Sequence, residues 1–445
     1  MKRNAPMYLP DSIAQILNAL EKAGFAAYVV GGCVRDACLG LEPQDYDLCT
    51  SALPEQTEAV FRDRKLVLAG KKHGTVGVVT DSGVVEITTF RTEGSYRDNR
   101  HPDWVRFVTD VESDLARRDF TVNAMAYSPT RGYADPFGGR EDLKNGILRA
   151  VGDPETRFQE DSLRILRGVR FAVKDQLTPE DATLSAMKSL APLMENLARE
   201  RVLEELCKLL VLVTAQDLNR FGPILAAVIP ELAPMIGFDQ RSPHHAYDLF
   251  THTAHVTENV PADLTLRWAA LLHDTGKIAS FTLDETGRGH FYGHADISAE
   301  LADQILRRLK APTQLREDAV ELIRLHMTKI EPTKKVVRRW LSRLGYEKME
   351  ALLCLQEADM SSKGTGIPHS ISQFAEIRQL MEEIKADNVC LSLKDLAVNG
   401  HDLMALGLTG PKIGHTLNRL LTLVLDETLE NDKAALLAAA RQETL

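Results

Sequence analysis

The motif Asp45-Tyr46-Asp47 places two carboxylates one residue apart in a segment that we expect to be a β-strand. Residues i and i+2 of a strand point to the same face, so the two side chains should project side by side. Carboxylates held that close repel each other unless a cation lies between them. Because Mg²⁺ prefers oxygen ligands, the pair predicts a magnesium site.

A Gly31-Gly32 pair lies upstream, between the apolar, strand-like run Tyr28-Val29-Val30 and a short helix-like segment at 33–39. Glycines before a helix leave backbone N–H groups free to approach phosphate oxygens. Either motif alone is more often a solvated turn than a functional site. Together, in one strand–turn–helix–strand unit, they indicate a metal-dependent site for a nucleoside triphosphate.

The Gly-Gly-x-Val-Arg-Asp sequence at 31–36, followed by the two aspartates, resembles the first motif of the nucleotidyltransferase superfamily. This version of the motif is similar to that of class II tRNA nucleotidyltransferases and bacterial poly(A) polymerases. The resemblance implies that Asp45 and Asp47 are catalytic and hold Mg²⁺. It also implies that the two glycines and Arg35 bind the nucleotide.

Glu86 lies among apolar and β-branched residues of a strand-like run at 84–90. On its own it would be a strand-edge carboxylate facing water, but the family resemblance makes it a third catalytic carboxylate. There it would complete the metal cage or act as a general base. The polar segment 91–106 that follows resembles the flexible loop that the family needs for the final A addition.

Residues 115–127 resemble the second motif of the family. We expect Asp119 and Asn123 to lie on one face of a helix, as an i, i+4 pair, with Arg118 adjacent. These acceptor and donor groups suit a ribose hydroxyl and a phosphate. Without the resemblance, a salt-bridged helix start at the surface is an equally good interpretation.

We expect Asp161 and Arg164 to share a face of one helix. An ordinary intrahelical ion pair, worth about 0.2–0.5 kcal/mol, would explain their spacing. An ionised Asp only accepts hydrogen bonds and an Arg only donates them. Cytosine and adenine present an amino donor beside a ring-nitrogen acceptor, whereas uracil and guanine present a carbonyl beside an N–H. An Asp–Arg edge would therefore accept C and A and reject U and G.

The sequence Glu-Asp-x-x-Arg-x-x-Arg-x-x-Arg-Phe at 160–171 is similar to the nucleotide-selecting helix of class II tRNA nucleotidyltransferases. The resemblance implies that Asp161 and Arg164 read the incoming base. Arg167 would support them or contact a phosphate.

The region from 244 to 362 contains histidines and aspartates that resemble the metal ligands of the HD-domain phosphohydrolase superfamily. An isolated histidine on an apolar helix is more often a core residue, but the Leu-Leu-His-Asp-Thr-Gly-Lys sequence at 271–277 favours metal binding. Whether such a domain is active or serves as a scaffold stays open, as does the metal. The resemblance implies His252, His273, Asp274 and Asp359 as ligands, with His294 and His326 as further ligands or substrate contacts.

The composition of the 445-residue chain is that of a globular protein, with 44% apolar residues and a net charge of −10. Bulk charge therefore disfavours nucleic acid, so RNA would have to meet local basic strips such as Arg199 and Arg201. The N-terminus lacks an apolar signal segment, and no run reaches the roughly 18 apolar residues of a membrane span. Six cysteines without a CxxC pair fit a reducing cytoplasm.

These patterns predict an α+β protein: a small mixed-sheet nucleotidyltransferase head followed by an all-helical neck and body, an HD domain and a tail. The tail carries Gly410-Pro411-Lys412-Ile413-Gly414, where the resemblance implies tRNA contacts. The predicted domains are the head at 1–150, the neck and body at 151–240, the HD domain at 241–362, and the tail at 363–445.

The resemblance implies a tRNA nucleotidyltransferase that adds or repairs the 3′-terminal CCA of tRNA from CTP and ATP. The reaction would need Mg²⁺ and no nucleic-acid template, and it would release pyrophosphate. The tRNA would bind through its acceptor arm and 3′ end. The alternatives are a bacterial poly(A) polymerase of the same family and a phosphohydrolase with an RNA-binding head.

Overall fold

The computed structural model describes residues 6–81, 83–94, 105–243, 245–364 and 371–441. Most of the predicted flexible loop at 91–106 lies outside the described residues. The chain divides into two compact units, the first made of residues 1–212 and 220–230 and the second of residues 213–219 and 231–445.

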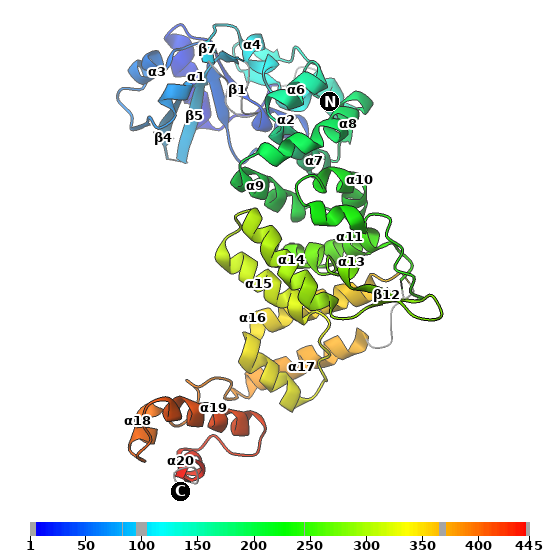
Figure 1. Cartoon of the computed structure of the whole chain (residues 1–445). Coiled ribbons are helices and arrows are strands. Elements are labelled where there is room, and N and C mark those ends of the chain that lie inside the picture. Colours follow the sequence, from blue (N-terminus) through cyan, green and yellow to red (C-terminus); the bar gives the residue numbers. More distant parts are fainter. Residues whose placement is uncertain (1–5, 82, 95–104, 244, 365–370, 442–445) are drawn as a thin grey trace. The chain divides into compact units, whose positions relative to one another are not determined.

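A seven-stranded mixed sheet forms the centre of the head, in the order β3-β4-β5-β2-β1-β8-β9. Only β2 and β5 run parallel, and the other neighbouring strands of this sheet are antiparallel. Figure 1 shows the labelled strands β1, β4 and β5 near α1 and α3. The strands of this sheet are β1 (Ala27–Val30), β2 (Asp47–Thr50), β3 (Leu66–Val67), β4 (Thr75–Thr80), β5 (Gly83–Thr89), β8 (Ala126–Ser128) and β9 (Gly132–Ala134).

Burial alternates along β5 as expected for a strand with one face on a core. Val85, Ile87 and Thr89 are buried, whereas Glu86 is exposed. The period of two therefore directs the apolar residues inward and leaves the carboxylate on the open face of the sheet. Two short pairs lie outside this sheet: β6 (Arg91–Glu93) with β7 (Val105–Phe107), and β10 (Ile147–Leu148) with β11 (Thr178–Pro179).

Helices surround the sheet and continue beyond it. Phe120, Phe158 and Phe171 are buried together, with ring centroids 6.3 and 6.1 Å from that of Phe120. These three rings pack α7 against the segment that follows α4. The helices are α1 (Asp11–Lys22), α2 (Gly32–Cys38), α3 (Pro54–Val60), η1 (Lys71–His73), α4 (Val111–Ala116), η2 (Thr121–Asn123), α5 (Gly139–Lys144), α6 (Pro154–Glu160), α7 (Leu163–Lys174), α8 (Asp181–Leu190), η3 (Ala191–Asn196), α9 (Arg199–Leu210), α10 (Ala215–Leu225) and η4 (Pro230–Met235).

The second unit is helical apart from one small hairpin, within the residues described. Its long helix α16 is interrupted at Gly345, whose φ of 75° lies in the left-handed region that favours glycine. The elements are α11 (Leu249–Asn259), α12 (Leu264–Leu272), α13 (Lys277–Ser280), β12 (Phe281–Leu283), β13 (Gly289–Phe291), α14 (His294–Arg308), α15 (Thr313–Leu325), α16 (Lys334–Ser361) and α17 (Ser372–Ala386).

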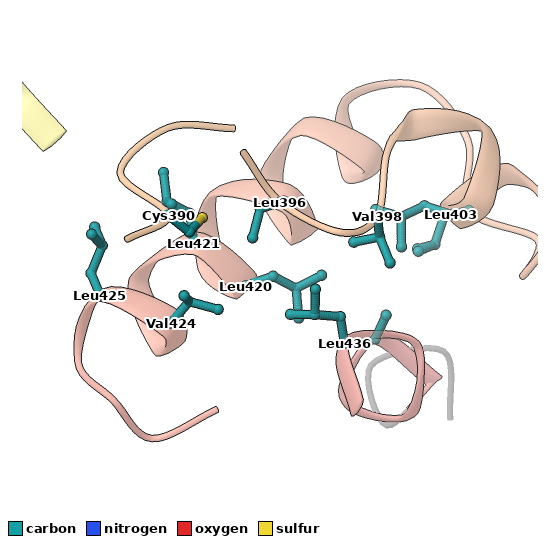
Figure 2. Close-up of a cluster of buried hydrophobic side chains, with 11 residues drawn as sticks. Cys390, Leu396, Val398, Leu403, Leu420, Leu421, Val424, Leu425 and Leu436 are labelled. Atoms are coloured by element: carbon teal, nitrogen blue, oxygen red, sulfur yellow. The ribbon is translucent and has the colours of Figure 1, made fainter. Parts of the chain in front are cut away.

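The C-terminal tail has its own apolar core, drawn in Figure 2. Leu396, Val398, Leu420 and Leu436 are among its buried residues. Its helices are α18 (Gly400–Met404), α19 (Pro411–Leu425) and α20 (Lys433–Arg441).

Ion pairs connect the tail to α16. Arg339 binds Asp426 with two hydrogen bonds of 2.7 and 2.6 Å, and Lys335 lies 3.5 Å from the same carboxylate. Arg338 pairs with Glu427 beside them. The contacts at this attachment thus include several charges, in contrast to the apolar interior of the tail.

The predicted α+β class is confirmed, with a mixed sheet in the N-terminal part and helices after it. The division into four domains stays a prediction. Within the described ranges, every helix is too short or too polar to cross a bilayer.

Replacing Phe120 with alanine should destabilise the first unit by about 3–5 kcal/mol, because a fully buried ring between two others is lost. Denaturant unfolding of the whole chain measures the change in the transition that reports this unit. Tyr8→Ala is the control, since Tyr8 is 82% exposed and should shift the free energy of unfolding by less than about 0.5 kcal/mol. Equal effects of the two substitutions would contradict the packing described.

Candidate functional site

The strand pairing places Asp47 beside the glycine turn. β1 and β2 are antiparallel with Val30 opposite Asp47, and Gly31 follows Val30 directly. Gly31 has φ +78° and precedes the first residue of α2, so it makes a turn that favours glycine. The carboxylate and the glycine turn therefore lie at the same end of the sheet, and the N–H of Gly31 donates to the carbonyl oxygen of Met125 at 3.0 Å.

The parallel pairing of β2 with β5 brings Glu86 to the same place. Leu48 lies opposite Ile87, and both side chains are 1% exposed. The residues that precede them, Asp47 and Glu86, therefore lie side by side on the other, exposed face. This register agrees with the prediction from the sequence that the two carboxylates lie close together.

Asp45 differs from the prediction because β2 begins only at Asp47. Asp45 lies in the loop before the strand, and the expectation that both aspartates share a strand is wrong. The pKa of Asp47 is raised above its ordinary value. Burial of the carboxyl group is the largest cause, the Arg118 guanidinium opposes it, and the Asp45 carboxylate raises the pKa further. Among the described residues, Asp45, Asp47 and Glu86 do not form a group whose ligand atoms all lie within 4.8 Å.

The guanidinium of Arg118 lies next to the glycine turn. A Cβ at Gly31 would lie 3.0 Å from Nη1 of Arg118, so a larger residue would displace this guanidinium. The Nε atom of Arg118 is buried and has no hydrogen-bond partner among the described residues, and Nη2 is 3.6 Å from Asp114. A cation, a glycine turn and two carboxylates thus meet in one corner, which suits a polyphosphate with a divalent cation.

Asp119 and Asn123 are in contact but not on one helix. α4 ends at Ala116 and η2 covers Thr121–Asn123, so the predicted continuous helix is wrong. The chain still turns tightly enough for Asn123 Nδ2 to donate to Asp119 Oδ1 at 3.2 Å. Arg167 Nε donates to Asp119 Oδ2 at 2.8 Å. Burial would raise the pKa of Asp119, but the Arg167 guanidinium lowers it to about 2.

Arg35 connects α2 to these residues and is only 3% exposed. Its Nη1 donates to Asn123 Oδ1 at 2.7 Å, and its Nε and Nη2 donate to Asp36. Nε also lies 3.2 Å from Asp175, just after α7. The side chain therefore ties the glycine turn and its helix to α7, while its contact with a nucleotide stays a prediction.

The expected Asp161–Arg164 helix is interrupted. α6 ends at Glu160, Asp161 is extended with φ −140°, and α7 begins at Leu163. The prediction that both residues lie on one helix is therefore wrong. The intrahelical ion pair that would explain the spacing is not formed either, because each side chain has other partners.

Arg164 contacts both the preceding helix and the head. Its Nη1 donates to Glu160 Oε2 at 2.8 Å, and its Nη2 donates to the carbonyl oxygen of Arg117 at 2.9 Å. Arg117 immediately precedes Arg118, so the start of α7 is bonded directly to the segment that covers the glycine turn. The two halves of the predicted nucleotide site are thus physically joined.

Asp161 binds Arg201, a residue that the sequence marked only as part of a basic strip. Arg201 Nη2 donates to Asp161 Oδ2 at 3.2 Å. Nothing in the local spacing predicts this contact, because the two residues are 40 positions apart. The contact depends on the packing of α9 against α7 in the folded chain.

A second group of polar residues is buried in the helical unit. His252 lies on α11, His273 and Asp274 follow α12, and Asp359 lies on α16. Asp274 Oδ2 is 3.5 Å from His252 Nε2 and 3.2 Å from His273 Nε2. Asp359 Oδ1 is 3.0 Å from His252 Nε2. The four residues predicted as ligands therefore come together.

The other oxygen of Asp274 faces a second pair of histidines. Oδ1 lies 3.4 Å from His294 Nε2 and 3.9 Å from His326 Nε2. Lys277 Nζ lies 2.8 Å from Oδ2. Burial would raise the pKa of Asp274, but His273 and Lys277 hold it well below its usual value.

Every histidine of this group is oriented by its other ring nitrogen, as in metal sites where an outer hydrogen bond fixes the ligand. Each Nδ1 donates to a backbone carbonyl, which leaves Nε2 directed at the carboxylates. The Nε2 atoms of His252 and His273 and both oxygens of Asp274 are buried, and their near neighbours include one another, the Asp359 carboxylate and the Lys277 ammonium. The Nδ1 bonds run from His252 to Ser362, from His273 to Ala270, from His294 to Phe291 and from His326 to Ile323, at 3.2, 2.8, 2.8 and 2.6 Å.

Comparison with protein families agrees with the geometry of the head. The "Poly A polymerase head domain" matches residues 27–149, "Probable RNA and SrmB- binding site of polymerase A" matches 176–235, and "tRNA nucleotidyltransferase domain 2" matches 290–440. The mixed-sheet head and the head-domain match at residues 27–149 together define the class, a nucleotidyltransferase of the poly(A) polymerase head class.

Relatives of known function narrow the class. The CCA-adding enzyme of Levilactobacillus brevis is 34% identical over 444 residues, which cover 97% of this chain and 98% of that enzyme. That of Ligilactobacillus salivarius is 43% identical over 242 residues, 52% of this chain and 59% of the relative. The crystal structure of the Bacillus stearothermophilus CCA-adding enzyme in complex with CTP matches with a TM-score of 0.70 and 28% identity, covering 97% of this chain and 96% of that one. The chain belongs to the family of CCA-adding enzymes.

Asp119→Asn should destabilise the first unit by about 1.5–3 kcal/mol at pH 7, because the buried Asp119 carboxylate no longer pairs with the half-buried Arg167 guanidinium. The folded pKa of Asp119, about 2, lies below its unfolded value, so the stabilisation is complete above about pH 4. It is lost as the pH falls toward 2. Chemical unfolding of wild type and variant should give a difference that shrinks between pH 4 and pH 2.

The control for this substitution is Glu204→Gln, which removes an exposed carboxylate paired with Lys208 on α9. It should change the free energy of unfolding by less than about 1 kcal/mol. A pH-independent effect of Asp119→Asn would contradict the proposed ion pair.

Proposed function

We propose that this chain adds the CCA sequence to the 3′ end of tRNA, using CTP and ATP and no nucleic-acid template. The observation that carries the proposal is the hydrogen bond from Arg164 to the carbonyl oxygen of Arg117. This bond joins the base-reading start of α7 to the corner formed by Gly31, Asp47 and Arg118. A nucleotide whose phosphates lie in that corner would have its base within the reach of α7.

Asp45, Asp47 and Glu86 would hold the divalent cation, which we take to be Mg²⁺. The donors fit a hard cation, since all are carboxylates near the open end of the sheet. Such a cation, when bound, neutralises the triphosphate and favours ionisation of the attacking hydroxyl. Gly31, Gly32 and Arg118 would bind phosphate oxygens, and Asp119 and Asn123 the ribose.

Asp161 and Arg164 would select the base. Asp161 accepts from the exocyclic amino group of cytosine or adenine, and Arg164 donates to the ring nitrogen beside it. Uracil and guanine would place a carbonyl against the carboxylate and an N–H against the guanidinium. Asp161 keeps one acceptor position on each oxygen, and Arg164, which donates to Arg157, Glu160 and Arg117, keeps two of its five N–H groups for this purpose. Arg167 supports them through Asp119.

Asp47→Ala should lower the rate of C addition to a tRNA that lacks its last three nucleotides by at least about 10³-fold. Incorporation is measured with each of the four triphosphates separately, on a gel that resolves single additions. The wild type should add C, C and A and then stop. Asp81→Ala, an exposed carboxylate in the turn before β5, is the control and should keep the wild-type rate.

The product distinguishes the related function within this class. A long run of A would identify a poly(A) polymerase, and full activity of Asp47→Ala would contradict the assignment of the site. Incorporation of U and G at the rates of C and A would contradict the role of Asp161 and Arg164.

A second function is favoured by the buried histidine group. We infer that His252, His273, Asp274 and Asp359 hold a divalent metal ion in an HD-type phosphohydrolase domain, with His294 and His326 as additional ligands. The support is the convergence of buried Nε2 atoms on the carboxylates of Asp274 and Asp359, at 3.0–3.9 Å. Imidazole and carboxylate together suit Mn²⁺ or a later transition metal. Bound there, such an ion would activate water against a phosphate ester.

Asp274→Asn should remove most of the bound metal while leaving CCA addition intact, since the two sites lie in separate units of the chain. Elemental analysis after loading with Mn²⁺ and gel filtration measures the metal per chain. His290→Ala is the control, because His290 pairs with Asp284 outside the group. Retention of the metal by Asp274→Asn would contradict the ligand assignment, and loss of CCA addition would contradict the independence of the sites.

A further inference from the structure

The carboxylate of Asp161 is held at both oxygens. Oδ1 accepts the backbone N–H of Leu163 at 3.0 Å, and Oδ2 accepts Nη2 of Arg201 at 3.2 Å. A carboxylate oxygen can accept two hydrogen bonds, so each oxygen keeps one acceptor position. Asp161 is therefore fixed in direction without being saturated.

Among the described residues, Arg201 forms its ion pair with Asp161, and no second acidic partner explains its position. The neighbouring acid on the same face of α9, Glu205, is taken by Arg170 at 2.6 Å. The Nη1 atom of Arg201 is buried and has no hydrogen-bond partner among the described residues. A buried donor without a protein partner is uncommon in native structures, and this N–H is available to a water molecule or a ligand.

We propose that Arg201 is a positioning residue for base selection, which aims the free acceptor sites of Asp161 at the amino group of the incoming cytosine or adenine. This inference deepens the proposed function and rests on it. Arg201 acts on the base through Asp161, so its effect should fall on selection rather than on the transfer of the nucleotidyl group.

The physical reason is that discrimination needs a fixed acceptor. If the carboxylate can rotate, it moves away from the carbonyl oxygen of uracil or guanine and the repulsion that rejects them is relieved. The Leu163 N–H alone restrains only one oxygen. Both restraints have an ionised acceptor, but only the Arg201 bond also has an ionised donor, so losing Arg201 removes an ion pair together with the hydrogen bond that holds Oδ2.

The test compares Arg201→Gln, Arg201→Lys and wild type in single-nucleotide incorporation onto a tRNA that ends before CCA. The measured quantity is the ratio of kcat/KM for CTP to that for UTP. We expect Arg201→Gln to lower this ratio on the order of 10-fold or more. Arg201→Lys keeps the charge but not the planar fork, so it should lower the ratio less.

Lys208→Gln is the matched control. Lys208 lies further along α9, is exposed, and pairs with Glu204, so its replacement should leave the ratio unchanged. The KM for tRNA and the melting temperature are measured for every variant. Both should stay near the wild-type values in Arg201→Gln.

Three outcomes would overturn the inference. The first is an unchanged ratio of kcat/KM for CTP to that for UTP, and the second is an equal loss of kcat/KM with all four triphosphates. The third is a rise in the KM for tRNA as the sole effect, which would make Arg201 an RNA contact. If Arg201→Gln has a lower melting temperature than the wild type, the test rests on the CTP-to-UTP ratio of kcat/KM for Arg201→Lys. A wild-type chain that does not prefer C and A over U and G would refute the proposed function itself, which separates the two failures.

Discussion

The hydrogen bonds between α7 and the segment 117–119 are the constraint on which the nucleotide site depends. Arg164 donates to the carbonyl oxygen of Arg117, and the half-buried Arg167 forms an ion pair with the buried Asp119. These directional contacts fix the rotation of α7, which the packing of Phe120 against Phe171 alone would not do. The residue between them, Arg118, is thereby held over the glycine turn.

The sequence predicted the class of fold and most of the residues that meet at the site. Motifs such as Gly31-Gly32 and Asp45-Tyr46-Asp47 carry local signals, because turns and strands are decided over a few residues. The periodicity was misleading at two places. Asp161 interrupts the helix expected at 160–167, and Asp119 lies between α4 and η2. In both cases tertiary hydrogen bonds satisfy the polar side chains better than a continuous helix would.

Long-range contacts explain what sequence reasoning could not reach. The partner of Asp161 on α9 is 40 residues away, and no spacing rule connects the two. In the second unit, residue types and a family resemblance predict which histidines and aspartates come together. Their arrangement around the two oxygens of Asp274 depends on five helices, α11, α12, α14, α15 and α16, and on backbone carbonyls that orient each imidazole. Such carbonyl partners have no signature in the sequence.

The attachment of the tail to α16 has a consequence for solution conditions. Arg338, Arg339 and Lys335 pair with Asp426 and Glu427 at partly exposed positions, whereas the tail packs its own leucines inside. Electrolyte weakens exposed charge pairs, with a screening length of about 8 Å at 0.15 M and about 3 Å at 1 M. Concentrated electrolyte therefore weakens the attachment of the tail to α16 more than it weakens the apolar interior of the tail.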